Sequence, residues 1–194
     1  TEESRWYQVR VRDVNECEDI DSLFISVFEL PSVLVSPDTN ICAGDSISLL
    51  AAGGLSYDWT PSVGLSNPNI ASPMASPATS TNYLVSALDA NGCENTADIS
   101  VVVNPLPEAD AGEDQAICPG GSALLSASGG ISYSWKPENL LSDPTGQNPT
   151  ATPRDTSAFI LTVTDENGCQ DTDLVLVNVL QNPDADAGQD TCFC

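Results

Sequence analysis

Two similar stretches decide the fold of this chain: Gly53–Pro61 reads GGLSYDWTP and Gly129–Pro137 reads GGISYSWKP. They are 76 residues apart (129 − 53 = 76). The same offset relates Ile41-Cys42-x-Gly44 to Ile117-Cys118-x-Gly120. A fixed period of this kind is the mark of a repeat architecture, in which each period is one structural unit. The sequence therefore predicts a tandem array.

The turn motif Asp-x-Asn-Gly-Cys marks the same point of each repeat. It occurs at Asp89–Cys93 and Asp165–Cys169, and an earlier copy at Asp13–Cys17 has Glu16 in place of the glycine, which leaves the turn type of that copy open. Because the first residue is Thr1, we expect the chain to be a segment of a longer protein. The period predicts four parts: the last strands of one repeat at 1–30, complete repeats at 31–106 and 107–182, and the start of a further repeat at 183–194.

Within a repeat, apolar side chains recur at every second position. Phe159, Leu161 and Val163 alternate with Ile160, Thr162 and Thr164, and a second alternating run through Val175, Val177 and Val179 follows the Asn-Gly turn. Period two is typical of strands, and an Asn-Gly turn accepts the positive φ angles of a tight hairpin. Convincing helical periodicity is lacking, so helix is limited to a single turn. About seven short strands in each period predict an all-β sandwich.

The charge of the chain argues against several classes of function. There are 28 acidic residues, 5 basic residues and no histidine, which gives a formal net charge of −23 and a pI near 4.1. Nucleic-acid binding is not expected, because little basic surface exists to neutralise phosphates. An enzyme is not expected either, since the sequence has no histidine base, Gly-x-Ser-x-Gly motif or phosphate-binding loop. Direct membrane insertion would need about 20 consecutive apolar residues, which the sequence does not contain.

Three motifs in order, Asp110–Gly120 (DAGEDQAICPG), Gly129–Pro137 and Thr164–Cys169 (TDENGC), resemble a known class of repeat. These are the PKD-like or immunoglobulin-like tandem repeats of very large Bacteroidetes cell-surface proteins, such as gliding-motility adhesins and other type IX secretion cargo. The resemblance extends over the whole chain and implies Ig-like or PKD-like β-sandwiches, export to the cell surface and a stalk role for the repeats. One departure is Ser36-Pro37-Asp38 in place of Gly112-Glu113-Asp114, so we expect the leading strand of the first full repeat to enter differently.

Seven cysteines without histidine favour disulfides over a zinc site, and disulfides predict an oxidising, extracellular location. The simplest pairing is within each repeat, Cys42 with Cys93 and Cys118 with Cys169. A bridge between neighbouring repeats stays open, because Cys42 would lie at the pole that faces the next hairpin turn, which carries Cys169, if the first strand runs the full height of its domain. We expect Cys17 and Cys194 to pair with cysteines outside the sequence.

Clustered carboxylates make calcium a candidate cofactor, because this hard cation takes oxygen ligands from aspartate and asparagine. The other reading is that aspartate and asparagine simply favour turns and form a solvated acidic surface. The candidate calcium ligands are Asp38, Asp89, Asn91, Asp110, Asp114, Asp165 and Asn167.

Aromatic residues in the repeated Ser-Tyr-x-Trp strand are the expected core anchors, because a small domain needs large buried side chains. These anchors are Tyr57, Trp59, Tyr133 and Trp135. The alternative role for the two tryptophans is as exposed platforms for carbohydrate.

Two serines fit the Asp-Ser-apolar acceptor sequence for O-glycans in the bacterial group of the resembling repeats. They are Ser22, in Asp21-Ser22-Leu23, and Ser46, in Asp45-Ser46-Ile47. The motif is short, so both residues also fit as ordinary strand or turn positions.

The sequence as a whole predicts a stalk or filament segment of a long extracellular protein, an adhesin, built from disulfide-stabilised repeats. Its expected partners are neighbouring repeats of the same chain and identical chains in a fibre. One alternative is a carbohydrate- or protein-binding module of a secreted protein. Another is a subunit that associates laterally into a sheath, which the dense negative charge opposes unless cations bridge the chains.

Overall fold

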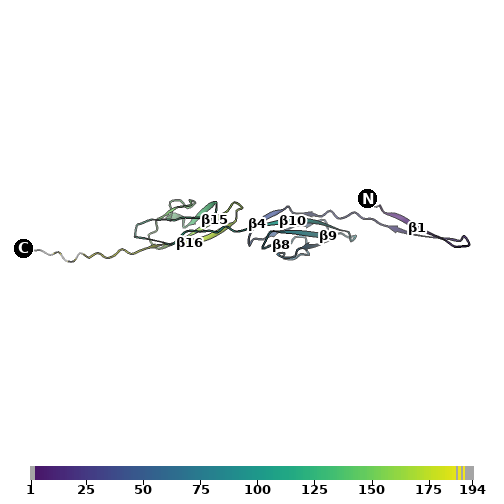
Figure 1. Cartoon of the computed structure of the whole chain (residues 1–194), viewed down its shortest axis with the longest axis horizontal. Coiled ribbons are helices and arrows are strands. Elements are labelled where there is room, and N and C mark those ends of the chain that lie inside the picture. The colour runs from purple at the N-terminus through teal and green to yellow at the C-terminus, as the bar shows by residue number, and fades with distance from the viewer. Residues whose placement is uncertain (1–2, 187, 189, 191–194) are drawn as a thin grey trace, which may run out of the picture. The chain divides into compact units, whose positions relative to one another are not determined.

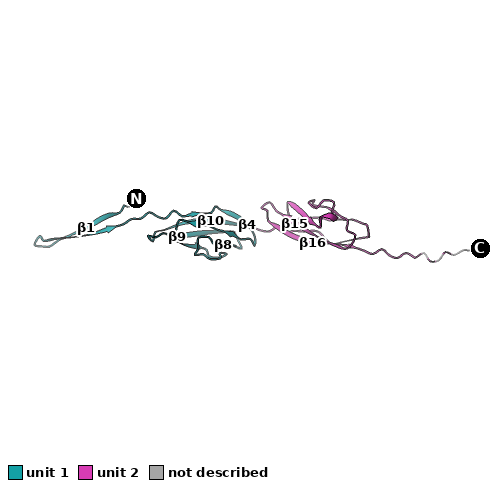
Figure 2. Ribbon diagram, turned by 180° about the vertical axis from the view of Figure 1, so that it is seen from behind, with its two compact units in different colours: residues 1–103 teal, residues 104–194 magenta. Residues whose placement is uncertain are grey.

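The computed structural model describes residues 3–186, 188 and 190, and the described part of the chain is all-β apart from one 3₁₀ turn, Glu138–Leu140. The chain divides into two compact units, residues 1–103 (unit 1) and 104–194 (unit 2), which Figure 2 colours separately. The prediction that helix is limited to a single turn is confirmed for these residues. The repeat boundaries at 31, 107 and 183 stay a prediction from the sequence period.

Unit 1 starts with a two-stranded antiparallel hairpin of β1 (Arg5–Arg12) and β2 (Glu18–Ile25). Its register runs from Arg5 opposite Ile25 to Arg12 opposite Glu18. Every residue of both strands is exposed. The hairpin therefore contributes no buried core of its own.

The sandwich of unit 1 has a four-stranded sheet in the order β4-β10-β9-β7, whose central strands β9 and β10 are labelled in Figure 1. Two short antiparallel pairs, β3 with β6 and β5 with β8, accompany it. The strands are β3 (Leu34–Val35), β4 (Thr39–Cys42), β5 (Ile47–Ser48), β6 (Ala51–Ala52), β7 (Ser56–Thr60), β8 (Met74–Ala75), β9 (Thr81–Leu88) and β10 (Glu94–Asn104).

The sandwich of unit 2 has the corresponding order β11-β16-β15-β13, with β11 parallel to β16 and the other neighbours antiparallel. One short pair, β12 with β14, accompanies this sheet. The strands are β11 (Gln115–Ile117), β12 (Ala123–Leu124), β13 (Ser132–Lys136), β14 (Thr150–Ala151), β15 (Ser157–Thr164) and β16 (Gln170–Val179).

Each unit has its own hydrophobic core, formed by the inward positions of the alternating strands. In β15, Phe159, Leu161 and Val163 are fully buried while Ile160 between them is about half exposed. In β9 the equivalent inward positions are filled by Tyr83, Val85 and Ala87, which are also fully buried. The predicted period-two pattern is thus confirmed, and each sandwich is an all-β, Ig-like fold.

The paired glycines before the Ser-Tyr-x-Trp strand allow the backbone to pass close to the leading segment. Gly53 and Gly129 have φ angles of +102° and +99°, in the region that disfavours side chains. A Cβ atom would overlap the carbonyl oxygen of Ser32 at the first position and that of Glu108 at the second. Only glycine therefore fits at these two equivalent positions without movement of the backbone.

The strand that follows carries the predicted core anchors. Trp59 and Trp135 are buried, and their indole N–H groups donate to the carbonyl oxygens of Ile70 at 2.9 Å and Gly146 at 3.1 Å. The structure therefore places both tryptophans inside the sandwich and not on an exposed carbohydrate platform. Tyr57 and Tyr133 are half-buried and pack against the cores, with their hydroxyls donating to the carbonyls of Gly54 and Gly130.

Candidate functional site

The Asp-x-Asn-Gly-Cys turns connect the two long strands of each hairpin and position a cysteine. In unit 1, an Asp89 carboxylate oxygen accepts the backbone N–H of Asn91 at 2.8 Å and that of Cys93 at 2.9 Å. In unit 2, Asp165 accepts the N–H groups of Asn167 and Cys169, both at 2.8 Å. The aspartate thus acts as an internal template for the turn, which fixes the backbone of the cysteine at the start of the next strand.

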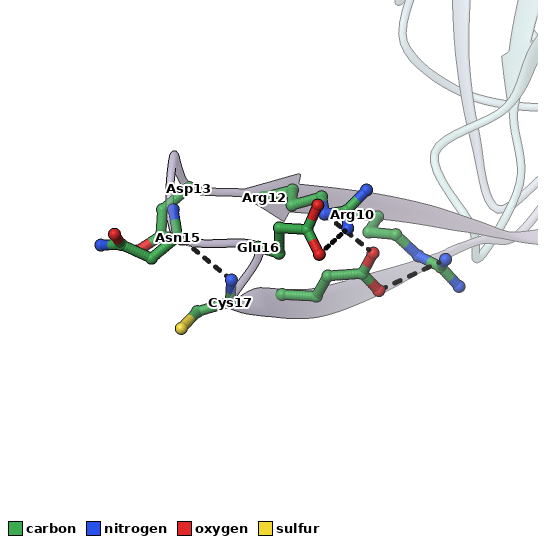
Figure 3. Close-up of polar contacts among 7 residues, drawn as sticks. Arg10, Arg12, Asp13, Asn15, Glu16 and Cys17 are labelled. Atoms are coloured by element: carbon green, nitrogen blue, oxygen red, sulfur yellow. Dashed lines mark hydrogen bonds and ion pairs between the residues drawn. The ribbon is translucent and has the colours of Figure 1, made fainter.

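The first copy of the turn keeps this geometry without the glycine. Asp13 accepts the N–H groups of Asn15 at 2.8 Å and Cys17 at 2.9 Å, and Figure 3 shows the Cys17 thiol pointing away from the strands. Glu16 has a φ angle of +69°, close to the +79° of Gly92 in the next copy. The sequence left this turn type open, and the structure shows that the aspartate hydrogen bonds preserve the turn.

These hydrogen bonds also affect ionisation. The pKa of Asp89 lies below its ordinary value, mainly because the Cys93 N–H donates to the charged carboxylate, and the pKa of Asp13 is lowered by the equivalent Cys17 N–H. Thr145 lowers the pKa of Asp143 in a turn of unit 2 in the same way, through its backbone N–H. At neutral pH these carboxylates are therefore charged acceptors that hold turns.

An ion-pair cluster lies on the N-terminal hairpin beside the first turn (Figure 3). Arg12 contacts Glu16 at 3.1 Å and Glu18 at 3.7 Å, and Arg10 contacts Glu18 at 3.4 Å. All four side chains are exposed, so each pair contributes little stability. The arginines offset part of the acidic charge locally, a role that depends on strand register and that the sequence analysis did not identify.

The other candidate calcium ligands form backbone contacts within their own repeat. An Asp38 oxygen accepts the N–H of Ser100 at 2.8 Å, and the equivalent Asp114 accepts the N–H of Leu176 at 2.8 Å. Asp110 accepts the N–H of Gly112 at 2.9 Å. These carboxylates anchor the segments before β4 and β11.

The structure brings together two pairs of the candidate calcium ligands, Asp89 with Asn91 and Asp165 with Asn167, each within a turn. Among residues 3–186, 188 and 190, no group of three or more histidine, cysteine, aspartate or glutamate side chains is arranged to hold a metal. Calcium binding stays a prediction.

Two acidic residues that the sequence analysis missed fasten the leading segment of unit 2. Asp171 and Asp173 accept the backbone N–H groups of Ala109 at 3.1 Å and Ala111 at 2.8 Å. Both carboxylates lie on β16, a strand whose other inward positions are apolar. Paired acids at alternate positions of such a strand are the sequence signal that identifies this role.

The cysteines differ from the simplest predicted pairing. Cys42 and Cys169 are disulfide-bonded, whereas Cys93 and Cys118 are free thiols. The expectation of bonds from Cys42 to Cys93 and from Cys118 to Cys169 is therefore wrong for this structure. Cys17 is a free, exposed thiol, and its pairing outside the sequence stays a prediction; Cys194 lies outside the described residues.

The topology of the sheet gives the physical reason. Cys118 follows Ile117, which lies opposite Val179 at the end of β16, whereas Cys169 comes directly before Gln170 at the start of that strand. Nine residue steps at about 3.3 Å each separate the two ends by roughly 30 Å. A disulfide requires Cα atoms within about 7 Å, so the two cysteines of one repeat do not reach each other.

The candidate glycosylation serines are both exposed. Ser22 lies on β2 opposite Gln8, and Ser46 lies in the loop between β4 and β5. An exposed hydroxyl is accessible to a transferase, and modification of either residue stays a prediction.

One depression on the surface of unit 2 is lined by Lys136, Pro137, Glu138, Asn139, Ala158 and Ile160. Over the part of the chain that the structure describes, none of the helices is long and apolar enough to cross a membrane.

Comparisons with known proteins give likeness of fold only. No family model and no curated protein matches the sequence. Among solved structures, the chain is similar to the first two immunoglobulin domains of DIP-gamma, at 13% identity and a TM-score of 0.39, over 78% of this chain and 98% of that one. It is also similar to the insect immune protein hemolin, described with implications for homophilic adhesion, at 12% identity and a TM-score of 0.42, over 90% of this chain and 56% of that one.

A bacterial structure gives a similar result. The chain is similar to a Ca²⁺-stabilised adhesin that helps an Antarctic bacterium bind ice, at 11% identity and a TM-score of 0.43, over 93% of this chain and 57% of that one. The chain thus spans little more than half the length of hemolin and of this adhesin. A shared fold at such identity does not transfer a ligand or a partner.

Proposed function

We propose that this chain is a structural segment of a stalk or filament on a cell surface, part of a long adhesin built from β-sandwich repeats. The observation that carries the proposal is the repetition itself. The sheets β4-β10-β9-β7 and β11-β16-β15-β13 have the same strand order. Each added repeat increases the length of an array, and contacts between neighbouring repeats contribute stiffness. A single binding or catalytic site would not require the same unit to be repeated.

Equivalent residues of the two units also make equivalent contacts, which supports a structural role for the repeat. The Asp38 contact to Ser100 and the Asp114 contact to Leu176 are both 2.8 Å long and 76 residues apart in sequence. Each contact ties a leading segment to the longest strand of its own sheet. Such ties resist peeling of that segment under tension.

The charge of the chain suits an exposed, extended role. A net charge of −23 on 194 residues makes like-charged repeats repel each other and keeps them solvated. The resemblance to PKD-like Bacteroidetes repeats supports export by type IX secretion. The disulfide-bonded state of Cys42 and Cys169 fits an oxidising, extracellular compartment. We expect no enzymatic activity.

Immunogold electron microscopy on intact cells tests the proposal, with antibody raised against residues 31–182. We expect label along thin fibres that project from the cell. The matched control is the same antibody after absorption with the purified repeats, which should remove the label. Label confined to a smooth envelope, or to secreted soluble material, would contradict the stalk role.

A binding module is the second candidate, and the outer face of unit 2 favours it. Ile160 and Leu174 lie opposite each other on adjacent strands and are 48% and 52% exposed, whereas the equivalent pair in unit 1 is Leu84 with Asp98. Exposed apolar side chains that face outward suit contact with a ligand. Glycan-array binding by the intact chain that Ile160→Ser with Leu174→Ser abolishes would favour this candidate over the stalk.

A further inference from the structure

We propose that the N-terminal hairpin is an acceptor surface for the leading part of a further β-sandwich repeat, and that Asp19 and Asp21 fasten this part through two of its backbone N–H groups. The leading part of a repeat is the stretch before its long hairpin, residues 31–79 in unit 1 and 107–155 in unit 2. The partner belongs to the same array of repeats, so this assignment rests on the proposed stalk.

The hairpin already has the form of the long hairpin of a complete sandwich. Offsets of one and two sequence periods relate β1 (labelled in Figure 1) and β2 to β9 and β10 of unit 1 and to β15 and β16 of unit 2. At its open end, the Ser4 hydroxyl oxygen accepts the N–H of Val27 at 2.8 Å. The equivalent Thr156 hydroxyl accepts the N–H of Val179 at 3.0 Å. The hairpin therefore holds its two strands together as a complete sandwich does.

One face of the hairpin, its inner face, is apolar and uncovered. Five apolar residues of this face are between 44% and 65% exposed, whereas their equivalents in both units are all 0% exposed. In unit 1 the leading part supplies Leu49 and Trp59 to the core that covers these equivalents. A continuous exposed apolar surface is a mark of a missing partner, and both sandwiches identify that partner as a leading part. The five residues are Tyr7, Val9, Val11, Leu23 and Ile25.

Two carboxylates on the inner face indicate which kind of leading part fits. Asp19 is equivalent to Asp171, which accepts a backbone N–H of the leading segment of unit 2 at 3.1 Å. Asp21 is equivalent to Asp173, which accepts a second N–H of that segment at 2.8 Å. Both pairs of acids also stand in the same register, since each lies on the second strand of its hairpin opposite a valine or leucine of the first.

The hydrogen bonds of Asp19 and Asp21 in the hairpin are local. Each carboxylate accepts the N–H of the next residue, at 3.0 Å and 2.8 Å, and both side chains are exposed. A leading segment of the unit 2 kind would supply two N–H donors to these charged acceptors, which form stronger hydrogen bonds than neutral ones.

A leading part of the unit 1 kind fits less well. Where the hairpin has Asp19, unit 1 has Asn95, whose side-chain amide donates to the carbonyl of Pro31 at 2.9 Å. With Asp19 in that place, the carbonyl would face a carboxylate, so two acceptors would meet without a proton between them. The hairpin is therefore matched to a leading part like residues 107–155.

Amide hydrogen exchange on an extended chain tests the acceptor surface. A second copy of residues 107–155, with Cys118→Ser in that copy, is joined directly before Ser4 in place of residues 1–3. We expect the amides of β1 and β2 to exchange about tenfold more slowly, or slower still, than in the original chain, with the unit 1 sandwich as the internal reference. Unchanged exchange in the hairpin would overturn the proposal.

An exchange of anchors tests the two carboxylates, with a copy of residues 31–79 (Cys42→Ser) joined in the same way as the matched control. Asp19→Asn with Asp21→Ala gives the hairpin the residues of unit 1 at these positions. This double variant should speed exchange of the hairpin about tenfold beside 107–155 and slow it beside 31–79. The same direction of change in both chains would refute the anchor assignment. Because the assay uses purified chains, its failure would leave the stalk proposal standing, and absence of surface fibres would leave the acceptor standing.

Discussion

The two sandwiches fasten their leading segments in different ways, although their four-stranded sheets have the same strand order. In unit 1, Leu34–Val35 pairs with Ala51–Ala52 as a short strand, and the side-chain amide of Asn95 donates to the carbonyl of Pro31 at 2.9 Å. In unit 2, only an isolated bridge joins Asp110 to Ser128 at the equivalent positions.

Carboxylates replace the missing backbone pairing in unit 2. Position 171, equivalent to Asn95, is an aspartate that accepts the N–H of Ala109, and Asp173 accepts the N–H of Ala111, where unit 1 has Ala97. The side chain has changed from donor to acceptor, and its backbone partner has changed from a carbonyl to an N–H. The comparison shows that satisfied hydrogen bonds at the edge, more than particular residues, are what the fold requires.

Loss of its buried tryptophan should strongly destabilise either sandwich, and the effect should stay within the unit that carries the substitution. We expect Trp135→Ala to destabilise unit 2 by about 3–5 kcal/mol, because it leaves a large cavity and an unpaired Gly146 carbonyl. Amide hydrogen exchange measured separately for each unit checks this, with unit 1 as the internal reference. Trp6→Ala, at a side chain that is 66% exposed, is the control and should leave both sandwiches unchanged. Equal losses in the two variants would mean that burial of Trp135 does not stabilise the fold.

The close approach of the glycine pair should be the next most sensitive feature. Gly53→Ala is expected to cost about 2–3 kcal/mol, because the new Cβ meets the Ser32 carbonyl at a positive φ. Urea unfolding monitored through the amide NMR signals of unit 1 provides the measurement. Gly92→Ala is the matched control, since Gly92 also has positive φ but nothing within 4 Å of its would-be Cβ, and should cost less. A larger loss in the control would contradict the steric argument.

Loss of a carboxylate anchor should destabilise unit 2 and leave unit 1 unchanged. Asp173→Ala is expected to destabilise unit 2 by about 1–2 kcal/mol, since it leaves the Ala111 N–H without its acceptor. Unit 1 already has alanine at the equivalent position 97 and should be unaffected. Faster exchange of the Ala111 amide would confirm the anchor, and unchanged exchange would exclude it.

Tyr83 of unit 1 and Phe159 of unit 2 are equivalent buried aromatic residues that differ by one hydroxyl group. The Tyr83 hydroxyl donates to the carbonyl of Val63 at 2.9 Å, whereas the equivalent Phe159 has no hydroxyl. Tyr83→Phe should therefore cost only about 0.5–1.5 kcal/mol, the typical net value of one hydrogen bond. Denaturant titration is the check. A loss above that of Gly53→Ala would show that the hydroxyl does more than bond Val63.

Acid should loosen the turn of unit 1 by a small amount. The pKa of Asp89 is lowered in the folded chain, so its contribution is complete above the ordinary value of 3.8 and is lost as the pH falls through the folded pKa. NMR titration of the Cys93 amide should detect the change below pH 4. In Asp89→Ala the pH dependence of this amide should disappear, and its persistence would assign the titration to another group.

The sequence alone determined the features that depend on near neighbours in the chain. Alternation of Phe159, Leu161 and Val163 defines a strand face, and the turn from Asp165 to Cys169 supplies its own hydrogen-bond acceptor. The 76-residue period predicted that the same strands and turns occur in both units. It also predicted Trp59 and Trp135 as buried anchors, and both are buried. Local steric and hydrophobic preferences are sufficient for each of these predictions.

Only the tertiary structure decided which distant groups meet. The simplest pairing of Cys118 with Cys169 is wrong, because β11 lies parallel to β16 and leaves the two cysteines at opposite ends. The roles of Asp38 and Asp173 likewise depend on strand order, which brings each carboxylate to a backbone N–H 62 residues away. Sequence spacing does not encode such contacts, because they arise from sheet topology, in which strands far apart in the chain become neighbours.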